Sequence, residues 1–314
     1  MVNARSDPST ILGTIGDTPL LELTALRPPG GARVVVKIEG ANPTGSMKDR
    51  MALAMIEGAR REGRLAPGHP VVELTGGSTG TSLALVCRAL GHPLSIVTND
   101  AVAREKIDMT RALGARVEVI RTPEGKVHPG LVPEMRARVE AIVKETGAFW
   151  TDQFNNAHQV EGYATLAAEV LRAEPDVTHF VHIVGTAGSS MGVSKALRAA
   201  RPGVGVRLVE PASSPWLTAG RGGSHGVEGT AGVPKPPLLQ RALYDDVVAI
   251  DEQEGRAMAR QLAREEGVFA GTSTGLNVVA ALQLAATLPA SATVLTIAVD
   301  TGLKYLAGDL YRFG

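Results

Sequence analysis

The chain has 314 residues, of which 44% are hydrophobic and 20% charged, a balance typical of a globular protein with a sizeable core. Its 32 basic residues match its 32 acidic ones and only 4% of residues are aromatic, so we expect no nucleic-acid partner. We also expect a cytoplasmic protein with no membrane partner, because there is no apolar signal core at the N-terminus and no apolar run long enough to span a bilayer.

Strands and helices are expected to alternate through the first half of the chain. Residues 32–39 are β-branched and bounded by Gly and Asn, which predicts a strand, and the apolar stripe of residues 48–65 predicts a helix with charges on its back. The expected elements that follow are a strand at 70–75, a helix at 81–91, a strand at 94–100, a helix at 101–114 and a strand at 115–122.

The alternation resumes after a polar, turn-rich stretch at residues 121–130 and a further helix. Expected elements of the second half are strands at 178–185, 204–211, 246–251 and 293–299, and helices at 192–200, 252–267 and 273–288. Such alternation predicts an α/β protein with parallel sheets covered by helices on both faces. Residues 213–237, rich in Gly, Ser and Pro, are expected to form a long loop.

Three turns of the chain have the placement at which parallel α/β folds bind ligands, where a strand or loop leads into a helix. The first is "NPTGSMKDR" (42–50), which puts Lys48 in the first turn of a helix that Ser46 can cap. The positive end of the helix dipole disfavours an ammonium group there, which would favour the neutral, nucleophilic amine if the side chain is partly buried. Most lysines at helix starts are nevertheless solvated, and this feature alone favours that reading.

The second turn is "TGGSTG" (75–80), between a strand and a helix. Its two adjacent glycines, Gly76 and Gly77, and the hydroxyl residues that follow would expose backbone N–H groups suited to a carboxylate or a phenolate. An equally good interpretation is a tight turn that needs glycine for a positive φ.

The third turn is "GTAGSS" (185–190), which combines glycines, hydroxyls and a helix start into a candidate phosphate cradle. No GK[ST] follows it, so it is not a P-loop. A dinucleotide-binding unit ending at Glu210 has a similar plan, but the turn lacks the G-x-G-x-x-G spacing and this interpretation is weaker.

In this order the three turns resemble those of the cysteine synthase and cystathionine β-synthase family of pyridoxal-phosphate enzymes, which carry NPxGSxKDR, TSGNTG and GTGGT. Other stretches resemble further motifs of the family: "IGDTPLLEL" (15–23), "QFNN" (153–156), "EGVFAGTSTG" (266–275) and "GLKYLAGDLY" (302–311). The resemblance covers essentially the whole chain. It implies a tryptophan-synthase-β-like fold of two lobes, with a smaller, movable domain at 40–150 and a larger one formed by 1–39 and 151–314.

The resemblance also implies a role for each site residue. Lys48 would be the Schiff-base lysine, and Gly185, Thr186, Ala187, Gly188 and Ser189 would bind the cofactor phosphate. Thr75, Gly76, Thr79 and Gln153 would hold the substrate carboxylate, while Ser78 occupies the family's asparagine position beside the cofactor's 3′-oxygen. Ser273 is expected to face the pyridine nitrogen, with Thr301 as second choice and Asp300 interpreted as a turn residue.

The implied reaction is β-replacement on an O-activated serine such as O-acetylserine, through an α-aminoacrylate, giving cysteine or a related β-substituted alanine. The implied partners are an amino-acid substrate and a small nucleophile, sulfide or another, in a homodimer. Two alternatives stay open: a serine/threonine dehydratase or other β-eliminating lyase, and a non-catalytic or nucleotide-binding α/β protein. Gly76 and Ser78 depart from the family's Ser and Asn, which puts plain O-acetylserine sulfhydrylation in doubt.

No metal site is expected. His158, His182 and His225 have no metal-ligand spacing and are interpreted as surface or packing residues. The single cysteine, Cys87, lies in an apolar run and is interpreted as a small buried hydrophobic residue.

Overall fold

The computed structural model describes residues 9–123, 130–230 and 235–312. Parts of the turn-rich stretch at 121–130 and of the long loop at 213–237 therefore lie outside the described residues. The chain divides into two compact units: unit 1 consists of Met1–Ile15 and Lys48–Gln159, and unit 2 of Gly16–Met47 and Val160–Gly314. This division differs from the expected 40–150 and 1–39 plus 151–314, because residues 40–47 group with unit 2 while the N-terminal residues up to Ile15 and residues 151–159 group with unit 1.

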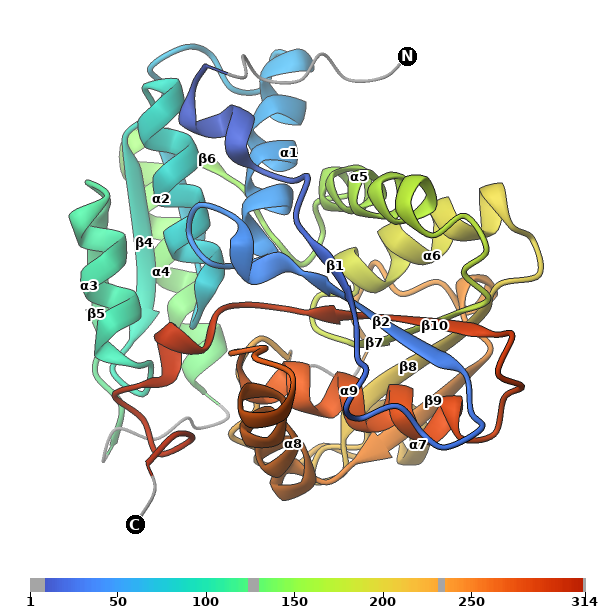
Figure 1. The fold of residues 1–314 in the computed structure, drawn as a ribbon. Coiled ribbons are helices and arrows are strands. Elements are labelled where there is room, and N and C mark those ends of the chain that lie inside the picture. The colour runs from blue at the N-terminus through green and yellow to red at the C-terminus, as the bar shows by residue number, and fades with distance from the viewer. Residues whose placement is uncertain (1–8, 124–129, 231–234, 313–314) are drawn as a thin grey trace. The chain divides into compact units, whose positions relative to one another are not determined.

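Unit 1 contains a parallel sheet in the order β5-β4-β3-β6, of which Figure 1 labels β4, β5 and β6. Its strands are β3 (Val71–Leu74), β4 (Leu94–Asn99), β5 (Arg116–Ile120) and β6 (Phe149–Trp150), and its helices are α1 (Lys48–Arg61), α2 (Ser78–Leu90), α3 (Arg104–Ala112) and α4 (Leu131–Thr146), with a short 3₁₀ turn η1 (Ile11–Thr14). Helices α2 and α3 carry the chain one strand further in one direction, whereas α4 returns it across the sheet to β6. Because such crossovers are right-handed, α4 must cover the opposite face, and its Leu131, Met135 and Val139 pack on Val72 and Val97.

Unit 2 contains a six-stranded sheet in the order β1-β2-β10-β7-β8-β9. The strands are β1 (Leu20–Glu22), β2 (Arg33–Ile38), β7 (His179–Ile183), β8 (Gly205–Pro211), β9 (Asp246–Ile250) and β10 (Thr293–Ala298). The helices are α5 (His158–Ala173), α6 (Gly188–Ala200), α7 (Trp216–Ala219), α8 (Glu252–Glu265) and α9 (Thr272–Ala285), with 3₁₀ turns η2 (Glu39–Ala41), η4 (Arg241–Leu243) and η5 (Gly302–Tyr305). All strand pairs are parallel except β1 with β2.

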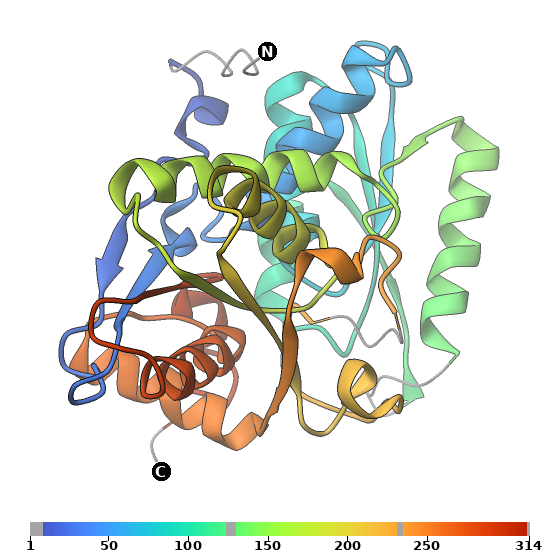
Figure 2. The same ribbon diagram turned by 90° about the vertical axis from the view of Figure 1, so that its right-hand side faces the viewer.

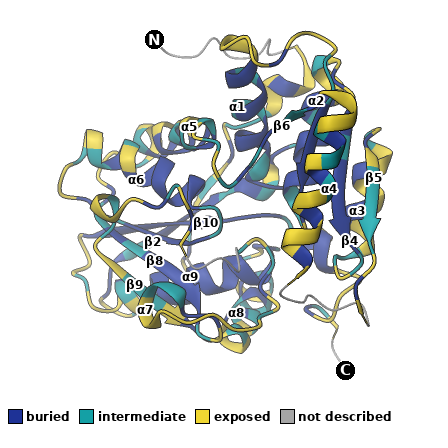
Figure 3. Ribbon diagram, turned by 180° about the vertical axis from the view of Figure 1, so that it is seen from behind, coloured by how far each residue is buried: buried dark blue, intermediate teal, exposed yellow. Residues whose placement is uncertain are grey.

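Helices cover both faces of this second sheet, α5 and α6 on one side and α8 and α9 on the other (Figures 1 and 2). Helix α9 is buried along most of its length because it lies between the strands and α8. Every residue of β10 is buried as well, as Figure 3 shows for the central strands. Strands β7 and β10 accordingly show no alternation of buried and exposed residues, as is typical of parallel strands covered by helices on both faces.

The expected α/β architecture is confirmed. Strands β1 and β6 and helix α5 are among the elements that the sequence did not predict. The antiparallel strand β1 has only three residues, and β6 has two. Helix α5 follows directly on the "QFNN" stretch and was not anticipated. The glycines expected to end helices do so: Gly91 is the left-handed C-cap of α2, with φ +76°.

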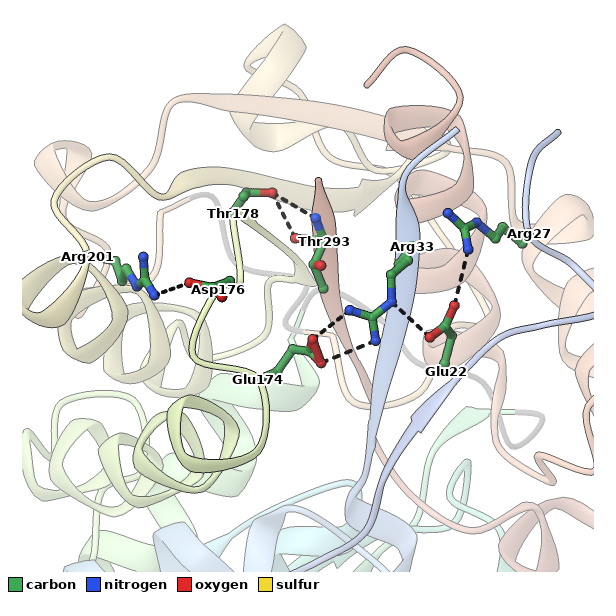
Figure 4. Close-up of polar contacts among 8 residues, drawn as sticks. All are labelled: Glu22, Arg27, Arg33, Glu174, Asp176, Thr178, Arg201 and Thr293. Carbon is green, nitrogen blue, oxygen red and sulfur yellow. Dashed lines mark hydrogen bonds and ion pairs between the residues drawn. The ribbon is translucent and has the colours of Figure 1, made fainter. Parts of the chain in front are cut away.

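An ion-pair network ties the antiparallel strand β1 to the rest of unit 2 (Figure 4). Arg33 on β2 donates through Nε to Glu22 on β1 (2.9 Å) and through Nη1 to Glu174 after α5 (2.7 Å). The two carboxylates raise the pKa of Arg33 above its usual value. The Arg33 side chain is about one-third exposed, so each pair contributes no more than about 1 kcal/mol.

A buried carboxylate plays the corresponding role in unit 1. Glu73, at the end of β3, is 1% exposed. Its Oε1 accepts hydrogen bonds from Leu74 N–H (2.7 Å) and Trp150 Nε1–H (3.2 Å), and its Oε2 accepts from Thr151 Oγ1–H (2.6 Å) and Gln153 N–H (2.9 Å). Burial raises the pKa of Glu73 to about 7, although these hydrogen bonds lower it in part. Glu73 thus joins the loop after β6 to the end of β3.

The raised pKa of Glu73 predicts a pH-dependent stability. Between pH 4.5 and about 7 the folded chain holds a proton that the unfolded chain releases, so the stability contributed below pH 4.5 is lost as the pH rises through 7. The shift corresponds to about 3 kcal/mol. Relative to Glu73→Gln, the wild-type free energy of unfolding should therefore fall by that amount across this window, as measured by urea unfolding at a series of pH values.

The control for the loss of one carboxylate is Glu134→Gln, which changes an exposed residue of α4 and should keep the pH dependence of the wild-type free energy of unfolding. If the free energies of unfolding of the wild type and Glu73→Gln run parallel across the window, the raised pKa of Glu73 is wrong.

Candidate active site

Lys48 is the first residue of α1, as expected, and it is half-buried. Helix α1 begins two residues after Ser46, whose backbone forms a short antiparallel bridge with Asp300. The chain passes from unit 2 to unit 1 between Met47 and Lys48. The residues just before Lys48 therefore belong to unit 2, and Lys48 itself belongs to unit 1.

A buried polar network in unit 2 holds those residues. Glu39 accepts hydrogen bonds from Thr18 Oγ1–H (2.7 Å) and Asn42 Nδ2–H (2.9 Å), and Asn42 Oδ1 accepts from Gly16 N–H (2.9 Å). Gly45 has φ +74°, and a Cβ there would lie 2.6 Å from Thr301 Cγ2. The loop before Lys48 thus has its side-chain acceptors satisfied in the interior, which fixes its path.

The "TGGSTG" turn joins β3 to α2 within unit 1. Helix α2 has no side-chain cap at Gly77 and no acidic residue in its first turn, so its N-terminal N–H groups are suited to an anion. The structure brings Thr79 and Gln153 together: Thr79 Oγ1–H donates to Gln153 Oε1 (2.9 Å), and Gln153 Nε2–H donates to Leu74 O (2.8 Å). Thr75 Oγ1 accepts from Gly77 N–H (3.1 Å). Thr79 and Gln153, both expected at the carboxylate site, are therefore joined by a hydrogen bond, and Thr75 lies in the same turn bonded to Gly77. We call Thr75, Thr79 and Gln153 the loop cluster.

Neither glycine of this turn is required by the backbone, which contradicts the alternative interpretation of the turn. Gly76 and Gly77 lie outside the positive-φ region, and Gly77 is extended. A Cβ on Gly76 would make ordinary contacts, 3.5 Å from Val102 Cγ2 and 3.8 Å from Asn99 Nδ2. A serine would fit at position 76, so Gly76 leaves open a volume that the family's serine fills. Ser78 is the first residue of α2.

The "GTAGSS" turn joins β7 to α6 within unit 2. Ala187 has φ +68°, a left-handed conformation that costs a non-glycine residue roughly 1–2 kcal/mol and that the family's glycine adopts freely. Helix α6 starts at Gly188, whose N–H donates to Thr186 Oγ1 (3.4 Å), and the N-cap residue Ala187 offers no side-chain acceptor. Gly185 approaches the chain closely: a Cβ there would lie 2.6 Å from Gly229 O. Left-handed and helical residues in succession aim backbone N–H groups at one point, which is the geometry of an anion-binding nest.

Of the three residues considered for the position facing the pyridine nitrogen, Ser273 and Asp300 each have a buried oxygen without a hydrogen-bond partner among the described residues, Ser273 Oγ and Asp300 Oδ1. Ser273 lies in the first turn of α9 and is 2% exposed. Thr301 Oγ1 accepts from Leu303 N–H at the start of η5, and Asp300 accepts from Tyr305 O–H (2.7 Å). A buried hydroxyl without a partner costs free energy, and a ring nitrogen of a bound group would satisfy it.

His182, near the phosphate turn, was interpreted from the sequence as a surface or packing residue. His182 on β7 is buried, and its Nε2 lies 2.9 Å from Ser189 Oγ. It is therefore neither at the surface nor a simple packing residue. The signal that could have revealed it is a histidine inside the apolar run "FVHIV", three residues before the glycine turn.

Two further findings concern metals and membranes. Within residues 9–123, 130–230 and 235–312, no group of His, Cys, Asp and Glu is arranged to hold a metal ion. Among the helices of these same ranges, none has the length and hydropathy needed to cross a membrane. Cys87 is buried, as expected, and burial raises the pKa of its thiol to about 12.

Comparisons with known proteins agree with these features. Residues 11–300 match the family described as pyridoxal-phosphate dependent enzyme. A probable cysteine synthase of Bacillus subtilis (strain 168) is 36% identical over 304 residues, 95% of this chain and 96% of the relative. An O-ureido-L-serine synthase of Streptomyces lavendulae is 36% identical over 306 residues, 96% of this chain and 92% of the relative.

Solved structures give the same result. The crystal structure of an O-ureido-L-serine synthase matches with a TM-score of 0.90 at 35% identity, covering 96% of this chain and 95% of that one. A cysteine synthase from Entamoeba histolytica matches with a TM-score of 0.91 at 29% identity, covering 99% and 93%. The chain therefore belongs to the family of pyridoxal-phosphate dependent enzymes, and its relatives are of the cysteine synthase type.

Proposed function

We propose that the chain catalyses β-replacement on an O-activated serine such as O-acetylserine, with pyridoxal 5′-phosphate as cofactor, giving cysteine or a related β-substituted alanine. The observation that carries the proposal is the loop cluster of Thr75, Thr79 and Gln153 at the uncapped start of α2. Hydroxyls, an amide and helix N–H groups together suit the α-carboxylate of an amino acid. Relatives named cysteine synthase and O-ureido-L-serine synthase support the same reaction class.

The residues of the chain have separate tasks in this proposal. Bound pyridoxal phosphate supplies an electron sink for negative charge at the substrate Cα. Lys48 would hold the cofactor until the amino group of the substrate displaces it, and its freed amine would then remove the proton from Cα as general base. The leaving group then departs from Cβ, a nucleophile adds at Cβ, and Lys48 returns the proton to Cα. The loop cluster holds the carboxylate, which fixes Cα within reach of the amine.

The residue that faces the pyridine nitrogen of the cofactor influences whether chemistry at Cβ, racemisation or transamination is favoured. We propose Ser273 for this position, since its buried hydroxyl lacks a partner among the described residues. A hydroxyl, unlike a carboxylate, leaves the ring nitrogen uncharged, which weakens the electron sink and favours chemistry at Cβ over racemisation or transamination. We also propose, from the family resemblance, that Ser78 lies beside the cofactor's 3′-oxygen, and that the protein acts as a homodimer in the cytoplasm.

The first prediction concerns Lys48. Purified protein reconstituted with pyridoxal phosphate should show a visible absorption band that Lys48→Ala abolishes, because the amine that holds the cofactor is gone. Turnover should fall by roughly 10²–10⁴-fold, the contribution typical of a general base. Lys195→Ala, which removes an exposed lysine from α6, is the matched control and should keep the band. An unchanged spectrum of Lys48→Ala would exclude Lys48 as the attachment site.

The second prediction separates replacement from elimination. With O-acetylserine and sulfide, the protein should form cysteine and acetate, with little pyruvate. Without a nucleophile, slow release of pyruvate and ammonia is expected, as water reaches the site. Product analysis by mass spectrometry decides the matter: pyruvate as the main product in the presence of saturating sulfide and other small nucleophiles would identify an eliminating lyase instead.

The third prediction concerns the volume left open at Gly76. Gly76→Ser should lower kcat/KM for a nucleophile larger than sulfide, such as hydroxyurea or an alkyl thiol, relative to kcat/KM for sulfide. One extra group in a pocket changes discrimination by about 10- to 200-fold. Competition assays with both nucleophiles measure this ratio. Gly77→Ala is the matched control, since its Cβ has no atom within 4 Å. An unchanged ratio in Gly76→Ser would show that this volume has no part in nucleophile choice.

A further inference from the structure

A chain of buried hydrogen bonds runs behind the phosphate turn, from α9 through β7 to α6. His182 is 1% exposed in the middle of an apolar strand, so its polar ring needs partners inside the protein. Its Nδ1 lies 3.2 Å from Asn277 Nδ2, and its Nε2 lies 2.9 Å from Ser189 Oγ. Asn277, which is fully buried in α9, and Ser189, which is 8% exposed, complete the chain.

The orientation of the Asn277 amide is determined by its backbone partners. Asn277 Oδ1 accepts from Ile183 N–H (2.7 Å), and Nδ2–H donates to Ile297 O (2.9 Å). A backbone N–H can only donate and a backbone carbonyl can only accept, so a flipped amide would lose both bonds. The second hydrogen on Asn277 Nδ2 therefore points at His182.

This orientation decides the tautomer of His182. Because Asn277 Nδ2 donates, His182 Nδ1 must accept, and the ring proton of the neutral imidazole is then on Nε2. His182 Nε2–H consequently donates to Ser189 Oγ. With one lone pair engaged by His182, the Ser189 hydroxyl keeps its own proton for another acceptor.

Ser189 is the second residue of α6, in the turn proposed to bind the cofactor phosphate. We propose that His182 and Asn277 are positioning residues that fix the Ser189 hydroxyl as a hydrogen-bond donor to this phosphate. The inference rests on the proposed phosphate site. His182 does not touch the cofactor in this proposal; it prevents Ser189 from turning its proton inward, so that the hydroxyl is pre-oriented before the phosphate arrives.

Cofactor affinity tests the proposal directly. Dissociation constants of pyridoxal phosphate and of pyridoxal, which lacks the phosphate, are measured on the apoprotein by equilibrium dialysis. Ser189→Ala should weaken pyridoxal phosphate binding by roughly 10- to 100-fold, the range for a hydrogen bond to a charged group, with little effect on pyridoxal. His182→Phe should weaken it by several-fold with the same selectivity, and His182→Gln should restore part of the loss, because its amide can still donate to Ser189.

A double-mutant cycle distinguishes positioning from general damage. In the Ser189→Ala background, His182→Phe should cause no further loss of pyridoxal phosphate affinity. Equal losses in both backgrounds, or equal losses for pyridoxal, would overturn the proposal. If the wild-type apoprotein binds pyridoxal phosphate no more tightly than pyridoxal, the proposed phosphate site itself fails, which is a separate outcome.

The tautomer has its own measurement, which needs no cofactor. Histidine-labelled ¹⁵N NMR of the wild-type apoprotein distinguishes a protonated Nε2 from a protonated Nδ1, and His182 is assigned by the resonance missing from His182→Gln. A proton on Nε2 and an unprotonated Nδ1 are expected. A proton on Nδ1 would contradict the orientation of the whole chain of hydrogen bonds.

Discussion

The proposed sites depend on two helix starts at which the N-cap residue has no side-chain acceptor. Helices α2 and α6 both begin immediately after a turn that follows a parallel strand, and neither has a side-chain hydrogen bond at its N-cap. An uncapped helix start has unsatisfied donors and a partial positive charge, so it favours an anion. In unit 1 the anion is proposed to be a substrate carboxylate, and in unit 2 a cofactor phosphate.

Both turns are held from behind by a buried polar residue of the preceding strand. Glu73 in β3 collects N–H and O–H donors from Leu74, Trp150, Thr151 and Gln153, and so places the amide of Gln153 beside Thr79. His182 in β7 is linked to Ser189 and Asn277 in the same way. Such groups are costly to bury and are retained where their hydrogen bonds are complete, which makes the turns they hold rigid. Rigid turns suit a site that must hold charged groups in one place.

The two turns differ in what their small residues do. Gly185 is needed because a side chain would collide with the carbonyl oxygen of Gly229. Gly76 meets no such obstacle, so the role proposed for it is the space it leaves and not the conformation it adopts. Ala187 holds a left-handed conformation without being glycine, a strain that the surrounding turn must maintain. The same composition of small residues therefore serves close approach in one turn and open volume in the other.

Much of this protein could be predicted from its sequence. Alternating apolar runs and glycine stops placed most strands and helices, because hydrophobic periodicity and helix termination act over a few residues. The ordered motifs around Lys48, Thr75 and Gly185 indicated the family and its cofactor. Beyond reach were the short strands β1 and β6, since strands of two or three residues form only where a neighbouring strand supplies the hydrogen bonds.

The tertiary structure alone decided which partner each buried group has. Asn277 and Ser189 are 88 residues apart in sequence, yet both hydrogen-bond to His182. Trp150 hydrogen-bonds to Glu73, 77 residues before it, from the neighbouring strand β6. It also showed that Ser273 Oγ is buried with no hydrogen-bond partner among the described residues, whereas Thr301 Oγ1 accepts from Leu303 N–H, which supports the proposal of Ser273 as the pyridine-facing residue. Local sequence determines periodicity and turns, whereas hydrogen-bond pairing between distant segments arises only when the strands and helices pack together.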